Sequence, residues 1–191
     1  MITAIVSDFF GVIAGSGFYN TYALAGGDPK IDREFIKEVL YETNMGQITS
    51  EEMVQKLCVK LNITPSVWEE ARVTSEAINQ PLLDYYKSLK PKYKIAILSN
   101  ANTNSINKRL TPEQLETFDV IVVSADVGMI KPDAEIYKLT AERLGVEPHE
   151  CLFTDDSQPY VDAAIEVGMK AVLFEDNESL KKEIELYTSA D

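Results

Sequence analysis

Apolar residues gather in five short runs along the chain, and these runs predict β-strands that are buried on both faces. Each run is rich in β-branched or bulky residues and lacks the alternation of apolar and polar positions typical of a strand with one exposed face. The runs are Ile2–Val6, Ile95–Leu98, Val120–Val123, Cys151–Phe153 and Ala171–Phe174. Strands of this kind favour a parallel sheet with helices on both sides.

Helical patterns precede the last four runs. The predicted helices are Leu82–Leu89, a helix opened by a capping box at Thr111–Gln114, Pro132–Leu144 and Val161–Val167. A glycine follows each of the last two segments, which is a common way for a helix to end. Strands that alternate with helices predict βαβ units, and therefore an α/β fold with a Rossmann-like, doubly wound parallel sheet.

The connection between the first two strands, Ser7–Lys94, is much longer than the others and contains no run typical of a strand. Its apolar residues recur at helical spacing over 35–40 and 53–61, and Thr64 followed by Pro65 has the form of a helix start. We therefore expect a small, all-helical cap inserted after the first strand.

A length of 191 residues suits one domain with a modest insertion. We predict that residues 1–14 and 81–191 form the α/β core and that residues 15–80 form the helical cap. The composition, 45% hydrophobic and 26% charged, is typical of a globular domain that folds on its own hydrophobic core.

The chain is acidic, with 31 Asp and Glu against 18 Lys and Arg and a net charge of −13. Such a charge repels phosphate backbones and anionic lipids, so we expect neither a nucleic-acid nor a membrane partner. No apolar run has the length of a transmembrane helix, and residues 1–6 lack the basic start of a signal peptide. Cys58 and Cys151 have no metal-binding spacing, which favours reduced thiols and a cytoplasmic location. The oligomeric state is left open.

Reactive side chains follow the predicted strands at their carboxyl ends, which is the edge where open parallel sheets bind ligands. In chain order they are Asp8, then Ser99 and Asn100, then Lys131, and finally Asp155 and Asp156. Carboxylates that are pressed together repel and are normally held ionised by a cation, and oxygen ligands favour Mg²⁺. Ser99 and Lys131 would then hold an anionic substrate against that metal.

This ordered set resembles the motifs of the haloacid dehalogenase-like (HAD) hydrolase superfamily, over nearly the whole chain. In that family an aspartate ends the first strand, Ser or Thr ends the second, a Lys often followed by Pro comes next, and an acidic pair ends the fourth strand. The matching residues here are Asp8, Ser99, Lys131–Pro132 and Asp155–Asp156. The predicted cap also lies between the first two motifs, which is the position of the family's helical C1 caps.

The resemblance implies a nucleophilic mechanism and a metal site. The Asp8 carboxylate would attack phosphorus to form an aspartyl-phosphate, which water then hydrolyses. Mg²⁺ would be held by Asp8, by the backbone carbonyl of Phe10 and by Asp156, with Asp155 close by.

The same resemblance assigns the substrate contacts. Ser99 and Lys131 would bind phosphoryl oxygens, and Asn100 would help to position the substrate. Stabilisation by the metal and the lysine would dominate, as in phosphoryl transfer generally.

Phe10 departs from the family pattern. In phosphatases of this family the second residue after the nucleophile is usually another Asp, which protonates the leaving oxygen and later activates water. A phenylalanine can do neither, and positioned acid–base catalysis is worth about 10²–10⁴ in rate. The departure favours leaving groups that need little protonation, such as acyl, aryl or anomeric sugar phosphates. Our first hypothesis is therefore a Mg²⁺-dependent hydrolase of a small phosphorylated metabolite, with a sugar phosphate as one candidate.

Three alternatives remain open. The family's 2-haloacid dehalogenases also lack the second Asp and use no metal, but the Asp155–Asp156 pair argues for a metal site. A catalytically weak protein that keeps the fold and binds a phosphorylated ligand or a partner is the second alternative. A phosphonate-cleaving enzyme would need a cap lysine for a Schiff base; the available lysines are Lys30, Lys37, Lys56 and Lys60.

A few further residues have two interpretations each. Trp68 and Tyr19 either line a substrate pocket under the cap or pack within it. Arg33 and Arg72 either bind a substrate anion or lie on solvated helix faces. Tyr160 falls where many relatives of the family place a further Asp of the metal loop.

Overall fold

The computed structural model describes residues 1–15 and 17–189, and within them the chain forms one five-stranded parallel sheet. The strands are β1 (Ala4–Ser7), β2 (Lys94–Ser99), β3 (Val120–Val123), β4 (Cys151–Asp155) and β5 (Lys170–Leu173). Their order is β3-β2-β1-β4-β5 and every neighbouring pair is parallel. The chain winds outward from β1 in both directions, which places the topological switch point beside β1.

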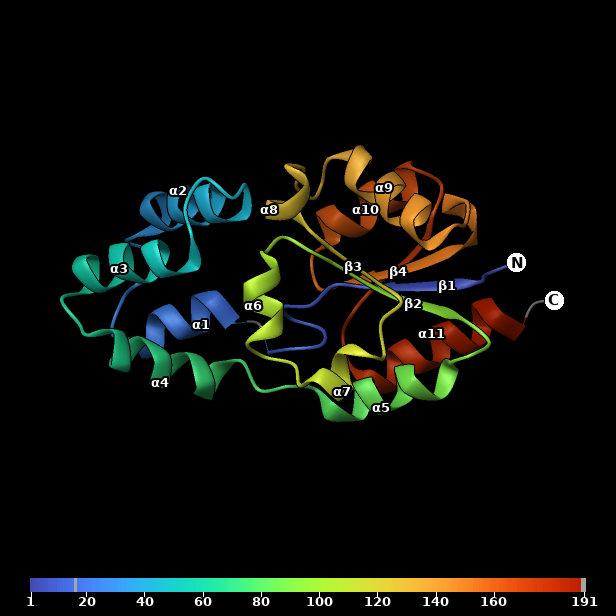
Figure 1. The fold of residues 1–191 in the computed structure, drawn as a ribbon, viewed down its shortest axis with the longest axis horizontal. Helices are drawn as coiled ribbons and strands as arrows, with labels where there is room; N and C mark the ends of the chain where they lie inside the picture. The colour runs from blue at the N-terminus through green and yellow to red at the C-terminus, as the bar shows by residue number, and fades with distance from the viewer. Residues whose placement is uncertain (16, 190–191) are drawn as a thin grey trace.

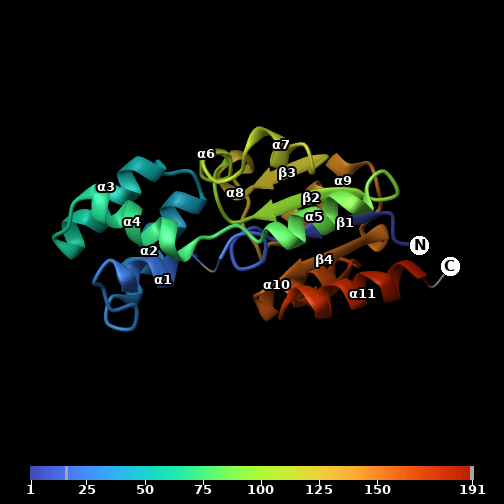
Figure 2. The same ribbon diagram turned by 90° about the horizontal axis from the view of Figure 1, so that it is seen from below.

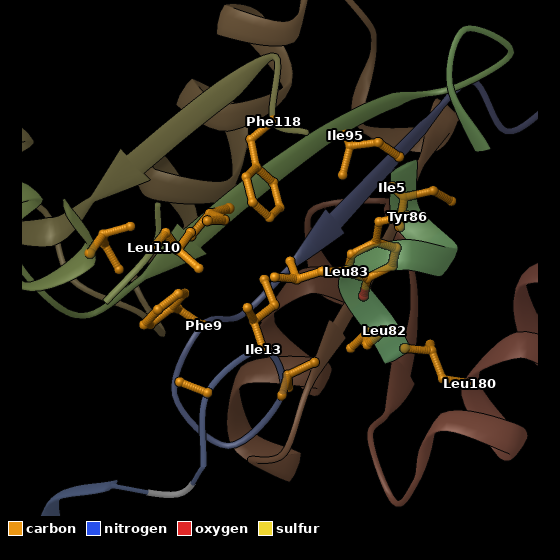
Figure 3. Packing of buried hydrophobic residues seen from close by; sticks show 14 of the residues in the cluster. Ile5, Phe9, Ile13, Leu82, Leu83, Tyr86, Ile95, Leu110, Phe118 and Leu180 are labelled. Carbon is orange, nitrogen blue, oxygen red and sulfur yellow. The ribbon is translucent and has the colours of Figure 1, made fainter. Parts of the chain in front are cut away.

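Helices cover both faces of the sheet because successive strand residues point to opposite sides. On one side Ile5 and Ile95 pack against α5 (Gln80–Leu89) and α11 (Asn177–Ser189), as Figure 3 shows from close by. On the other side α9 (Ala134–Leu144) and α10 (Gln158–Glu166) pack with the strand residues Val6, Leu98 and Phe153. Figure 1 shows α9 and α10 on one side of the sheet, opposite α5 and α11. The predicted doubly wound α/β fold is confirmed.

In the described part of the connection after β1, the first four helices share a small core of their own. They are α1 (Gly17–Leu24), α2 (Arg33–Asn44), α3 (Ser50–Leu61) and α4 (Pro65–Ser75). Tyr22, Ile36, Leu57 and Trp68 are buried among them. Figures 1 and 2 show these helices as a separate lobe, and in Figure 2 the arrows of β2 and β3 point toward it. This four-helix insertion (α1 to α4) therefore lies beyond the carboxyl ends of the strands.

Two linkers, running in opposite directions side by side, join the insertion to the sheet. The N–H of Gly15 donates to the carbonyl of Ala77 (3.0 Å), and the N–H of Asn79 donates to the carbonyl of Ile13 (2.8 Å). A Cβ on Gly15 would lie 2.3 Å from the carbonyl oxygen of Ser75, so this close pairing requires glycine. We propose this paired linker as the boundary between a core of residues 1–14 and 81–191 and a cap of residues 15–80.

Short helices complete the described part of the chain and correct some predicted boundaries. They are α6 (Thr103–Asn107), α7 (Pro112–Leu115), α8 (Ser124–Val127) and the 3₁₀ turn η1 (Pro148–Glu150). The helix predicted from Pro132 begins at Ala134, because Asp133 has an extended backbone with ψ 130°. The first strand begins at Ala4 rather than Ile2. Among the described residues, no helix is both long and apolar enough to cross a bilayer.

Leu82 provides a test of how the sheet is covered. Its side chain is completely buried on α5 against the sheet (Figure 3), so Leu82→Ala is expected to lower the free energy of unfolding by about 2–5 kcal/mol. Val59 is 83% exposed on α3, and Val59→Ala is expected to change it by no more than about 0.5 kcal/mol. Urea unfolding monitored by circular dichroism measures both. Equal losses in the two variants would contradict this assignment of the core.

Candidate active site

A buried lysine joins two aspartates that end neighbouring strands. Asp8 directly follows β1, Asp155 is the last residue of β4, and Lys131 lies in the loop between α8 and α9. The Nζ atom of Lys131 is 2.8 Å from Oδ1 of Asp8 and 2.5 Å from Oδ2 of Asp155. All three residues are buried: Lys131 is 2% exposed, Asp8 is 6% exposed and Asp155 is 0% exposed. Residues as far as 123 positions apart in the chain thus form one ion cluster at the sheet edge.

Asn100 fixes the backbone that carries Lys131. Its Nδ2 donates to the carbonyl of Lys131 (3.0 Å), and the N–H of Lys131 donates to its Oδ1 (2.8 Å). The ammonium group also lies 4.9 Å from the ring centre of Tyr160 and 5.6 Å from that of Phe153. Two hydrogen bonds to the backbone and two aromatic faces therefore hold the lysine between the carboxylates.

Asp156 adds a third carboxylate beside the cluster. One oxygen from each of Asp8, Asp155 and Asp156 can be chosen so that all lie within 4.8 Å of one another. Asp156 is exposed and lines a cavity, whereas the other two are buried. Gly11, with φ +96°, makes room for it: a Cβ there would lie 2.1 Å from Oδ2 of Asp156. The turn after Asp8 therefore requires glycine both for its backbone angle and for this contact.

The cluster has more negative than positive charge, since three carboxylates face one ammonium group. Burial, together with the charge of Asp8, raises the pKa of Asp155 to about 7 even though Lys131 opposes the shift. Partial desolvation and the charge of Asp8 also raise the pKa of Asp156. Burial alone would lower the pKa of Lys131, but the charges of Asp8 and Asp155 outweigh it and raise that pKa. Such a site has an excess of negative charge.

The donors fit a hard divalent cation. All three side-chain ligands are carboxylate oxygens, which Mg²⁺ prefers over nitrogen or sulfur. Among the described residues no hydrogen bond to the carbonyl of Phe10 is seen, whereas the carbonyl of Phe9 accepts from Ile13 and Ala14. The carbonyl of Phe10 is therefore available as a further oxygen ligand.

Ser99 and Phe10 complete the predicted set at the same edge. Ser99 is the last residue of β2, which pairs with β1, and it is 1% exposed. The ring of Phe10 stands edge-on to that of Phe9, with 5.0 Å between ring centres, and lines the cavity. No acid occupies that position of the chain.

A cavity of about 850 Å³ lies between the four-helix insertion and the sheet edge. Phe10, Asn100 and Asp156 line it from the sheet, while Tyr19 and Trp68 line it from the insertion. The aromatic residues of the insertion thus face the candidate site, although Trp68 is also buried in the small helical core.

Of the two arginines considered in the insertion, Arg72 lines this cavity and Arg33 does not. None of the four lysines considered as Schiff-base candidates lines it either; these are Lys30, Lys37, Lys56 and Lys60. Lys56 and Lys60 lie instead along a separate groove in the insertion. The phosphonate-cleaving alternative therefore has no support from the lysines that it needs.

Arg109 and Glu76 also line the cavity, and the sequence patterns did not identify them. The guanidinium carbon of Arg109 lies 5.0 Å from the ring centre of Phe10, and its Nε donates to Oε2 of Glu76 (2.6 Å). Both residues lie outside the motifs. In the sequence, the position of Arg109 shortly after the second strand is the feature that could have placed it near the site.

Curated relatives match parts of the chain. A bifunctional epoxide hydrolase 2 of Rattus norvegicus is 32% identical over 122 residues, which are 61% of this chain and 22% of that protein. The chain thus spans about a fifth of the length of this relative. A phosphorylated carbohydrates phosphatase of Thermotoga maritima is 34% identical over 110 residues, which are 54% of this chain and 50% of that protein.

A solved structure shares the fold along nearly the whole chain. It is a HAD family enzyme from Bacteroides thetaiotaomicron in complex with magnesium and inorganic phosphate, with a TM-score of 0.74 and 24% identity. The likeness covers 94% of this chain and 99% of that one. The family model for haloacid dehalogenase-like hydrolases matches residues 2–168, which include all four strand-end motifs. This chain therefore belongs to the haloacid dehalogenase-like hydrolase family.

Proposed function

We propose that this chain is a Mg²⁺-dependent phosphatase that acts on a small phosphorylated metabolite through an aspartyl-phosphate on Asp8. The observation that carries the proposal is the charge of the site: three carboxylates gather around one lysine at the sheet edge, and one of them, Asp156, lines the cavity. A divalent cation balances the excess negative charge of such a cluster, and the bound cation together with Lys131 then attracts an anionic substrate. The phosphatase relative and the magnesium and phosphate bound to the structural neighbour support this assignment.

The metal would be held by Asp8, Asp156 and the carbonyl of Phe10, with Asp155 close by. When bound, it supplies positive charge that stabilises the negative charge developing on the transferred phosphoryl group. The described contacts of Asp155 are to Lys131 and to the N–H of Ser157, which orient it beside the metal ligands.

Asp8 is the nucleophile in this proposal. Its Oδ1 is bound to Lys131, and one carboxylate oxygen would attack phosphorus while the other would hold the metal. A bond forms between that oxygen and phosphorus as the bond to the leaving oxygen breaks, and the electron pair departs with the leaving group. Water then attacks the phosphorus of the aspartyl-phosphate, which releases inorganic phosphate and restores Asp8.

Lys131 and Ser99 would bind the phosphoryl oxygens. Lys131 provides a fixed positive charge in a dry site, where electrostatic stabilisation is strongest. The amide of Asn100 is already bonded to the backbone of Lys131, so we propose that it positions the substrate indirectly, by holding the lysine.

The leaving group must depart without an acid at Phe10. Acyl, aryl and anomeric sugar phosphates meet this requirement, because their leaving groups are weak bases or are assisted by the sugar ring oxygen. The cavity of about 850 Å³ has room for such a metabolite. A metal-independent 2-haloacid dehalogenase remains the second candidate because of Phe10, since a halide leaves without a proton.

Asp8→Asn tests the nucleophile. Hydrolysis of p-nitrophenyl phosphate in Mg²⁺ is expected to fall by about 10⁴-fold or more, because the amide cannot form the aspartyl-phosphate. Chelator is expected to abolish the wild-type activity. Turnover of 2-haloacids that persists in chelator would favour the dehalogenase instead. Absence of any turnover, together with retained Mg²⁺ binding, would favour a binding protein.

The leaving-group preference tests the role of Phe10. The wild type is expected to hydrolyse acetyl phosphate and p-nitrophenyl phosphate with a kcat/KM about 10²–10⁴-fold above that for glycerol phosphate. The reason is that an alkoxide leaves poorly without a proton donor. Comparable kcat/KM values for all three compounds would show that another group supplies the proton.

The raised carboxyl pKa values predict a pH dependence of Mg²⁺ binding. Mg²⁺ binds the ionised carboxylates, so its affinity is expected to rise from pH 5 to about 7 and to level off above the pKa of Asp155. Without metal the folded state holds the extra proton between about pH 4 and 7, so stability falls as the pH rises through this range. Thermal unfolding with and without Mg²⁺ measures both effects. The same curves in Asp155→Asn should show a smaller step, which Asp156 contributes, and a step of unchanged size and midpoint would contradict the assignment.

A further inference from the structure

A second group of charges lies in the cavity wall, apart from the Lys131 cluster. Oε2 of Glu76 accepts from Nε of Arg109 (2.6 Å) and from Nη1 of Arg72 (3.1 Å). The side chains of Glu76 and Arg109 are only 6% and 11% exposed. A single carboxylate oxygen therefore serves two guanidinium groups in a largely dry wall.

The described residues accept from three of the N–H donors of Arg109. Its Nη1 donates to the carbonyl of Ser105 (2.7 Å), and its Nε and Nη2 contact Glu76. A guanidinium group has five N–H donors, so two are left on Arg109 for an anion in the cavity that it lines. Arg72 also keeps two N–H donors, but both oxygens of Glu69 already bind its Nε–Nη2 edge. The guanidinium of Arg109 is distinguished by its position over the ring of Phe10.

The position of Arg109 defines which part of a substrate it would meet. Its guanidinium lies over the ring of Phe10, the second residue after the nucleophile. On the proposed function, that position faces the leaving group, whereas the phosphoryl group lies against Lys131 and the metal. The guanidinium of Arg109 is therefore on the leaving-group side of the cavity.

We propose that Arg109 binds a second anionic group, a carboxylate or a phosphate, on the leaving group of the substrate, in exchange for part of its contact with Glu76. The planar fork of arginine matches both kinds of anion. The substrate class is then a small phosphorylated metabolite with a second negative charge at its far end. This proposal rests on the proposed function only in so far as the latter places the phosphoryl group beside Asp8.

Binding of phosphonates, which are not hydrolysed, tests the proposal. A series of ω-carboxyalkylphosphonates of increasing chain length is titrated into the Mg²⁺-loaded protein by calorimetry, beside the matching ω-amides. At the best chain length the carboxylate is expected to bind about 10–100-fold more tightly than its amide, as for a charge-assisted pair of hydrogen bonds. A parallel series of bisphosphonates tells whether the second anion is better matched by a carboxylate or a phosphate.

Three variants assign the preference to one side chain. Arg109→Gln is expected to remove the preference for the carboxylate while leaving the affinity for the amide unchanged, which also shows that the variant is folded. Glu76→Gln is expected to increase the preference, because it removes the competing carboxylate. Arg72→Gln breaks a contact with the same glutamate and is expected to keep the preference.

Opposite effects of Arg109→Gln and Glu76→Gln on the preference indicate anion binding by Arg109. If the salt bridge between them were only structural, both variants would bind the carboxylate and the amide more weakly. The proposal would be overturned by the absence of any preference at every chain length in both series, by a preference that survives Arg109→Gln, or by its loss in Arg72→Gln alone. Phosphonate binding with this preference but without hydrolysis of p-nitrophenyl phosphate would refute the proposed activity and not the anion site.

Discussion

The site depends on one electrostatic constraint, which is that three carboxylates share a sheet edge with a single buried lysine. Lys131 contacts Asp8 and Asp155 at the same time, and both partners are almost completely removed from water. Removing one partner of such a buried pair leaves an uncompensated charge, which costs several kcal/mol. The surrounding residues keep the lysine between the two carboxylates. Asn100 fixes its backbone, and the rings of Phe153 and Tyr160 lie against its ammonium group. The negative charge that the lysine does not neutralise favours a bound cation.

The hydrophobic sheet explains why these charges meet where they do. Strands covered by helices on both faces leave no place for a charged side chain along their length, so polar residues concentrate beyond the strand ends. With β1 at the centre of the order β3-β2-β1-β4-β5, the residues that follow β1, β2 and β4 become neighbours. The four-helix insertion lies beyond the same edge (Figure 2). Its residues line the cavity together with Phe10, Asn100 and Asp156. Burial of the apolar strands thus determines where the charged residues of the site lie, although it does not determine the net charge of the site.

Much of this arrangement can be predicted from the sequence, because it follows from local patterns. Runs of β-branched residues marked the strands, glycines and capping residues marked the helix ends, and strand-end positions marked Asp8, Ser99 and Lys131. What could not be predicted depends on contacts between distant residues. Helix α1 has no apolar stripe that would reveal it, and the contact of Glu76 with Arg109 joins residues 33 positions apart that follow no pattern. Asn100 shows the same limit. Its position after the second strand predicted that it lies at the site, whereas its hydrogen bonds to the backbone of Lys131 are seen only in the structure.

Phe10 is best understood within the charge balance of the site rather than as a simple loss. An aspartate at this position would be a fourth carboxylate beside Asp8 and Asp156, in a cluster whose carboxyl pKa values are already raised. Phe10 instead packs against Phe9 and lies beneath the guanidinium of Arg109. On the proposed function these two residues lie on the leaving-group side of the cavity. Phe10 transfers no proton, and the arginine would stabilise the negative charge that an unprotonated leaving group carries away. On that proposal the aromatic residue and the arginine act together, and electrostatics on the leaving-group side takes the place of an acid.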